Sequence, residues 1–63
     1  MCLSSVYKEQ EKPENLILAN VQRIDIRDGQ VFLTDLMERQ MAIHGELVMA
    51  NLVEGVAVVR EAA

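Results

Sequence analysis

The sequence is poor in the residues on which most enzyme chemistry depends. Its 63 residues contain one cysteine, one histidine, one proline, three glycines and no tryptophan. A lone cysteine cannot form an intrachain disulfide, so the chain is not a disulfide-stabilised secreted domain. Ser4 and Ser5 lack the context of a catalytic nucleophile, and none of the glycines forms a phosphate-binding loop. We therefore expect no catalytic residues, no cofactor-binding motif and no enzyme activity.

The sequence also lacks a basic patch and a long apolar run. Ten acidic residues against six basic ones give a net charge of −4, and the arginines are interleaved with acids. Nucleic acid, whose binding requires an electropositive surface, is not an expected partner. The N-terminus shows no secretory pattern, and the longest apolar stretch, "LVMANLVEGVAVV", is interrupted and too short to span a bilayer. We expect a soluble, cytoplasmic protein that does not contact membranes.

Aliphatic residues, by contrast, are abundant. Hydrophobic residues make up 51% of the chain, although it has only one Phe and one Tyr. A chain of this length forms one small domain, residues 1–63, and buries only about 60% of the surface that its unfolded form exposes. So much apolar material on so small a domain predicts that a second copy covers one face. We expect a homodimer, the most common symmetric oligomer.

Turn signals divide the chain into short strands. "RDG" at 27–29 predicts a hairpin, and "HG" at 44–45 and "EG" at 54–55 predict two more reversals. The charged segment "KEQEKPEN" at 8–15 predicts an exposed loop, and residues 62–63 a frayed end. Five to seven short strands in 63 residues indicate an all-β fold, a small antiparallel barrel or rolled sheet.

Hydrophobic alternation supports the strands. Ile24 and Ile26 alternate with charged residues, and Met41 and Ile43 alternate with Gln40, Ala42 and His44, which predicts one face on a core. The runs "QVFLTDLM" and "VAVV" are apolar on both faces, as in strands covered on both sides. Between Val21 and Ile24 the alternation of apolar and polar residues shifts by one position, which predicts a bulge or bend there. Residues 46–55 fit either a helix or a strand, and we favour the strand.

Cys2 is the one residue whose neighbours suggest specific chemistry. A thiolate, an amide nitrogen and a free α-amine lie within a few bonds of one another there and can chelate one metal ion. If Met1 is kept, the donors are the Met1 amine and the Cys2 amide and sulfur. If Met1 is removed, the Cys2 amine and sulfur remain. A dimer with adjacent N-termini would offer a planar nitrogen and sulfur set, which suits Ni(II) and Cu(II) better than Zn(II).

Two simpler interpretations remain open at this point. Cys2 can be an ordinary small apolar residue on a first strand, and His44 can be a solvated residue beside a glycine rather than a metal ligand. The chain can also be an interaction module with no metal, which binds a protein rather than RNA because of its acidic charge.

The segments "MCLSSVY", "LILANVQRIDIRDGQVFLTDLMERQMAIHG" and "VAVVRE" together resemble the CooT family. These are small homodimeric nickel-binding proteins associated with maturation of nickel-containing carbon monoxide dehydrogenase. The likeness covers nearly the whole chain, with one departure: after "DLM" the family pattern leads us to expect a glycine, and this sequence has Glu38. The HypC-type hydrogenase maturation chaperones also begin Met-Cys-Leu, but their longer pattern is not visible here.

The resemblance implies a compact all-β dimer, similar to small RNA-binding barrels, that holds Ni(II) at its interface through Cys2. Met1 joins the expected site through its amine, by the chelate argument above. The implied role is to hold or deliver nickel as an accessory protein, with a nickel carbon monoxide dehydrogenase or a similar metalloenzyme as the client.

Overall fold

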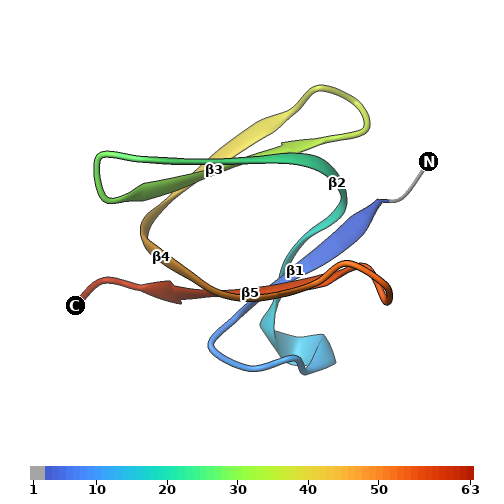
Figure 1. Cartoon of the computed structure of the whole chain (residues 1–63), viewed down its shortest axis with the longest axis horizontal. Helices are drawn as coiled ribbons and strands as arrows, with labels where there is room; N and C mark the ends of the chain where they lie inside the picture. The colour runs from blue at the N-terminus through green and yellow to red at the C-terminus, as the bar shows by residue number, and fades with distance from the viewer. Residues whose placement is uncertain (1–2) are drawn as a thin grey trace.

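The fold is a closed barrel of five strands. The structure, a computed structural model, describes residues 3–63. The strands follow one another around the ring as β1 (Ser4–Lys8), β2 (Leu16–Arg27), β3 (Gln30–Asp35), β4 (Gln40–Asn51) and β5 (Val56–Glu61). A 3₁₀ turn, η1 (Pro13–Asn15), lies between β1 and β2 (Figure 1). The all-β barrel predicted from the spacing of turn signals is confirmed.

Strands adjacent in sequence pair antiparallel, and the ring is closed by a parallel pair. In that pair β1 lies against β5, with Val6 opposite Ala57 and Tyr7 opposite Val58. Nothing in the hydrophobic pattern indicated this parallel contact, because it joins segments about 50 residues apart. It ties the first described strand to the last, so both ends of the chain depend on one ladder.

The predicted hairpin at 27–29 is confirmed as the connection between β2 and β3. Asp28 and Gly29 both have positive φ angles, 53° and 72°. This is the requirement of a two-residue turn that matches the twist of its strands, and Asp-Gly meets it with little strain. The predicted reversal at 54–55 is also present, with Gly55 at a φ of 72°. Residues 46–51 belong to β4, so the strand interpretation of this segment is correct.

The reversal predicted at "HG" (44–45) is wrong. β4 continues through His44 and Gly45 without a turn, and Gly45 lies opposite Glu61 of β5. A Cβ atom at Gly45 would lie 2.0 Å from the carbonyl oxygen of Arg60. The glycine is therefore explained by close approach of the two backbones and not by turn geometry.

The parity slip predicted between Val21 and Ile24 is present as an irregularity in the β2–β3 register between Val21 and Arg23. A second irregularity interrupts the β4–β5 register between Leu47 and Met49. Bulges of this kind bend a strand sharply. They let the two twelve-residue strands, β2 and β4, curve around the ring (Figure 1).

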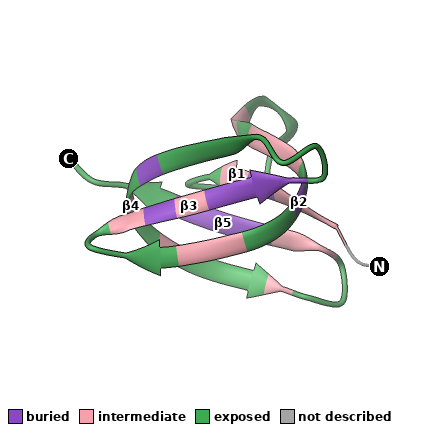
Figure 2. Cartoon of the chain, turned by 90° about the horizontal axis from the view of Figure 1, so that it is seen from above, coloured by how far each residue is buried: buried purple, intermediate pink, exposed green. Residues whose placement is uncertain are grey.

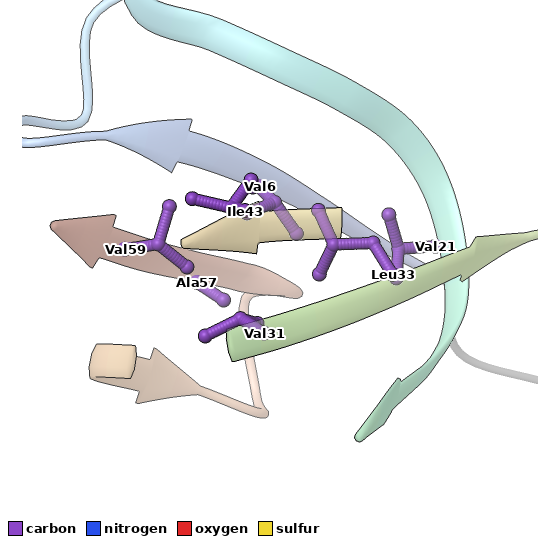
Figure 3. Close-up of a cluster of buried hydrophobic side chains, with 7 residues drawn as sticks. All are labelled: Val6, Val21, Val31, Leu33, Ile43, Ala57 and Val59. Atoms are coloured by element: carbon purple, nitrogen blue, oxygen red, sulfur yellow. The ribbon is translucent and has the colours of Figure 1, made fainter. Parts of the chain in front are cut away.

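The core is a cluster of aliphatic side chains inside the ring (Figure 3): Val6, Val21, Val31, Leu33, Ile43, Ala57 and Val59. Figure 2 shows that the buried positions are concentrated on β3 and β5, the two strands with apolar residues on both faces. The predicted alternation holds for Ile24, which packs against the core, and for Ile43. It fails at Ile26, which is 59% exposed because it lies near the end of β2, where the ring no longer covers it.

Residues 3–63 contain no helix whose length and hydropathy would allow it to cross a bilayer. The cytoplasmic location remains a prediction from the sequence.

Candidate functional site at the N-terminal end of the barrel

The two predicted metal ligands, Cys2 and Met1, lie outside the described residues. The structure begins at Leu3, the residue that directly follows Cys2. What it shows is the part of the barrel to which the proposed ligands are attached.

The first described residues, Leu3 to Ser5, contact the turn between β4 and β5. Ser5 donates its amide hydrogen to the carbonyl oxygen of Gly55 at 2.9 Å. A Cβ atom at Gly55 would lie 2.9 Å from the carbonyl oxygen of Leu3, closer than such contacts allow. Gly55 thus serves two purposes, since its positive φ completes the turn and its missing side chain leaves room for the backbone of Leu3. The residue after Cys2 therefore has a defined place against this turn.

An open hollow of about 430 Å³ lies beside the chain start. Its lining comes from β1, from the bend of β2 and from the β4–β5 turn: Ser4, Val21, Gln22, Arg23, Ile24 and Leu52. The bulge between Val21 and Arg23 shapes its wall, because it turns β2 away from its regular course. This places a mainly aliphatic recess next to the residue that follows the proposed ligands.

The same end of the barrel carries the turn between β3 and β4, which Asp35 holds in place. The Asp35 carboxylate is 1% exposed and accepts hydrogen bonds from the amides of Met37 and Arg39, both at 2.9 Å. It also accepts one from Nε of Arg39 at 2.8 Å. The amide of Leu36 donates to the carbonyl oxygen of Asn20 at 2.8 Å, which attaches the turn to β2. The turn is therefore a fixed part of this end.

The charge state of Asp35 follows from these contacts. Burial by itself would raise the pKa of the carboxyl group. The hydrogen bonds from Arg39, the positive charge of its guanidinium and the amide of Met37 outweigh burial and lower the pKa of Asp35 below its ordinary value. Sequence analysis missed this residue, since Asp35 stands among Glu38 and Arg39 as acids do on a solvated surface.

His44 lies away from the chain start. It is exposed on β4 opposite Gln30. The neighbouring Gly45 donates its amide hydrogen to Gly29, in the β2–β3 turn at the other end of the barrel (Figure 1). A wider open hollow of about 610 Å³ is found there, partly lined by the ion pair of Arg60 with Glu46. The structure does not bring His44 and Leu3 together.

The described part of the chain offers no alternative metal site. Among residues 3–63 no three His, Cys, Asp or Glu side chains lie close enough to hold an ion. The outer face of β2 carries a bidentate pair, in which Arg23 donates to Asp25 at 2.8 and 3.2 Å. This hydrogen bond and the charge of Asp25 raise the pKa of Arg23. Arg27 stacks on the ring of Phe32, 4.0 Å from its centroid.

One comparison with known proteins identifies the chain's relatives. The family model described as "CO dehydrogenase accessory protein CooT" matches residues 1–60. No curated protein matches the sequence. The family match confirms the resemblance seen in the sequence. It also confirms the expectation that the protein is not an enzyme, since the family is one of accessory proteins.

Proposed function

We propose that this chain, which belongs to the CooT family of CO dehydrogenase accessory proteins, holds or delivers Ni(II) through its N-terminal residues in a homodimer. The observation that carries the proposal is the extent of the family match, which begins at residue 1 and so includes Met1 and Cys2. Nickel is the cargo of the protein, to be passed to a nickel carbon monoxide dehydrogenase.

Ligand chemistry supports Cys2 as the principal donor. It is the only cysteine of the chain, and thiolates are ligands that bind late first-row metals strongly. The adjacent backbone amide and the amine of Met1 complete five-membered chelate rings with the sulfur. Each chain then contributes nitrogen and sulfur donors, and two chains contribute a planar set that suits Ni(II).

The described residues support this assignment by exclusion and by position. The potential ligands within 3–63 do not form a cluster that could compete with the N-terminus. Ser5 donates its amide hydrogen to Gly55 in the β4–β5 turn, and the backbone of Leu3 lies against Gly55, so Cys2 is joined to a residue with a defined place at one end of the barrel. Because each N-terminus is joined to a folded domain, association of two copies would raise the effective concentration of one N-terminus near the other.

The proposal is tested by native mass spectrometry of the protein with and without Ni(II). The parent protein should form a dimer that binds nickel with loss of protons, because the thiol must ionise before it coordinates. Binding should therefore weaken as the pH falls. Cys2→Ser should abolish tight nickel binding and leave the dimer intact.

His44→Ala is the matched control, since it removes the one histidine at the other end of the barrel and should leave nickel binding unchanged. If Cys2→Ser bound nickel as tightly as the parent, the proposed donor would be wrong. If His44→Ala alone lost the metal, the site would lie at the opposite end.

A further inference from the structure

The outside of the barrel carries an apolar row that crosses four neighbouring strands. Tyr7 of β1 lies opposite Leu16 of β2 on one side and opposite Val58 of β5 on the other. Val58 in turn lies opposite Met49 of β4. Residues directly opposite each other in a ladder point to the same face of the sheet. The four side chains therefore form one continuous row, which we call the outer row.

The outer row points away from the core. Along their strands, Tyr7 and Val58 alternate with members of the core cluster (Figure 3): Val6, Ala57 and Val59. Successive side chains of a strand point to opposite faces, so the row lies on the outer face. Leu16 and Met49, at the two ends of the row, are 46% and 37% exposed, whereas Val58 in the middle is buried. The row is thus apolar surface that the barrel leaves partly uncovered.

The row beside it on the same face is uncharged. Ser5 of β1 lies opposite Val56 of β5, and Val56 lies opposite Asn51 of β4. Val48, which precedes Met49 at the irregularity of β4, adds another exposed apolar side chain. Two adjacent rows therefore lack charge in a chain in which 25% of the residues are charged. Depletion of charge, together with tyrosine and methionine, is typical of the centre of a protein–protein interface.

The other exposed large apolar residues do not extend this face. Four of them lie on turns: Leu36, Met37, Leu52 and Val53. Ile26 and Met41 lie opposite residues of the core cluster, so they face the interior of the barrel. The outer row differs from both groups, because its members come from four strands that pair side by side.

Acidic segments frame the outer row. Residues 8–15 and 46–61, which border the row and carry part of it, contain six acidic residues against three basic ones. They account for three units of the net charge of −4. Figure 1 shows the loop of the first segment, with η1, on the side of β1 and β5 that faces away from β3. Most of the excess negative charge of the chain therefore lies in segments around this face.

The basic side chains of the frame are largely engaged. Arg60 contacts Glu9 at 3.8 Å and Glu46 at 3.0 Å. Lys8 contacts Glu61 at 3.2 Å. One arginine is thus shared between two carboxylates, which leaves negative charge available to a basic partner at the margin of the apolar row.

We propose that the outer row is the docking surface for a basic amphipathic helix of a partner protein. The apolar face of a sheet is stably covered by a helix. Four strands about 4.8 Å apart give a row roughly 14 Å long, which a helix of about ten residues spans. Lysine or arginine residues on its flanks would meet the acidic frame. A second copy of this chain fits less well, because it would bring an equally acidic frame against the first.

The probe for the test is a synthetic peptide of leucine and lysine, about 14 residues long, with the leucines at helical spacing. Fluorescence anisotropy of the labelled peptide should show binding to the parent in the micromolar range. The double variant Leu16→Gln/Met49→Gln should bind it about tenfold more weakly or worse, since two apolar contacts are lost. Met37→Gln/Leu52→Gln is the matched control, because it makes the same changes on exposed turns and should bind like the parent.

Neither double variant alters the net charge, so a difference between them reports the apolar contact and not general electrostatic attraction. All four substituted positions are exposed, and circular dichroism should report a native fold. If a double variant were unfolded, Met49→Gln and Met37→Gln alone would repeat the comparison.

Several results would overturn the proposal. Equal binding by the two double variants, or no binding by the parent, would do so. A peptide with glutamate in place of lysine should not bind, since the acidic frame repels it, and equal binding of that peptide would count against the frame. If Leu16→Gln/Met49→Gln instead abolished dimerisation in ultracentrifugation, or released the protein from phosphatidylcholine vesicles, a second copy or a lipid surface would cover the row.

The inference concerns a partner and not nickel, so its failure is distinguishable from failure of the proposed function. Cys2→Ser should bind the peptide like the parent, and Leu16→Gln/Met49→Gln should bind nickel like the parent. Loss of peptide binding in Cys2→Ser would place the contact at the N-terminus and contradict the outer row as the docking surface.

Discussion

At the scale of single residues, Glu38 stands where glycine fits better. Its φ angle is 66°, in the left-handed region that side chains with a Cβ atom avoid. The family pattern led us to expect glycine after "DLM", and the structure gives the reason for that expectation. The turn retains its shape because Asp35 holds the amides on either side of Glu38.

We predict that Glu38→Gly stabilises the protein by up to about 1 kcal/mol. The relief of left-handed strain exceeds the additional backbone entropy that glycine brings to the unfolded chain. Urea unfolding followed by circular dichroism would measure the change. Glu38→Ala is the control, because it removes the same carboxylate and its contact with Gln22 but keeps the Cβ atom. Equal stability of the two variants would show that the strain is not released.

Asp35 makes the stability of the protein depend on acid pH. Its pKa is lowered in the folded state, so its stabilising contribution is fully present above the unfolded value, about 3.9. That contribution is lost as the pH falls through the folded pKa. Asp35→Asn should therefore lower the unfolding temperature at neutral pH, and the difference from the parent should shrink below about pH 4.

Thermal unfolding followed across this pH range would measure the effect. Asp25→Asn is the matched control, because it makes the same substitution in an exposed ion pair with Arg23 and should change stability little. A constant difference between the parent and Asp35→Asn at every pH would contradict the assigned charge effect.

At the scale of strands, β4 and β5 approach each other closely at Gly45. Because a Cβ atom there would overlap the carbonyl oxygen of Arg60, Gly45→Ala must push the two strands apart. We predict a loss of about 3 kcal/mol or more in the free energy of unfolding, the upper range for overpacking a fitted contact.

Gly29→Ala is the comparison that isolates this effect. Gly29 has a positive φ, but no other atoms lie within 4 Å of the place that a Cβ atom would take there. The change should therefore cost only about 1 kcal/mol, the strain of the left-handed backbone. In denaturant unfolding, the free energy of unfolding should be clearly lower for Gly45→Ala than for Gly29→Ala. The reverse order would refute the close-approach explanation.

The two glycines also show what the sequence could predict about the fold. The turn at Asp28 and Gly29 was predictable because its cause is local: two adjacent residues accept positive φ angles. The role of Gly45 was not, because its reason is a carbonyl group on a strand that pairs with it only in the folded barrel. The parallel contact of β1 with β5 was hidden for the same reason.

For the candidate site, too, only the local features could be predicted from the sequence. The chelating character of Cys2 and Met1 was visible because the donor atoms are joined by a few covalent bonds. The role of Asp35 and the hollow beside Leu52 became apparent only from the folded chain, since they combine residues from β1, β2 and two separate turns.

At the scale of the whole molecule, the barrel has two unlike ends. The β3–β4 and β4–β5 turns lie at one end, and the β2–β3 turn and the C-terminus lie at the other (Figure 1). Large apolar side chains are exposed on the turns of the first end, and ion pairs such as Arg60–Glu46 link the strands near the second.

The parallel ladder between β1 and β5 also has a consequence for biosynthesis. β1 is made about 50 residues before its parallel partner, residues 56–59 of β5. Until β5 has been made, one edge of β1 has no neighbour and the ring stays open. The barrel can therefore close only after β5 has been made, so the last step of folding must follow its synthesis.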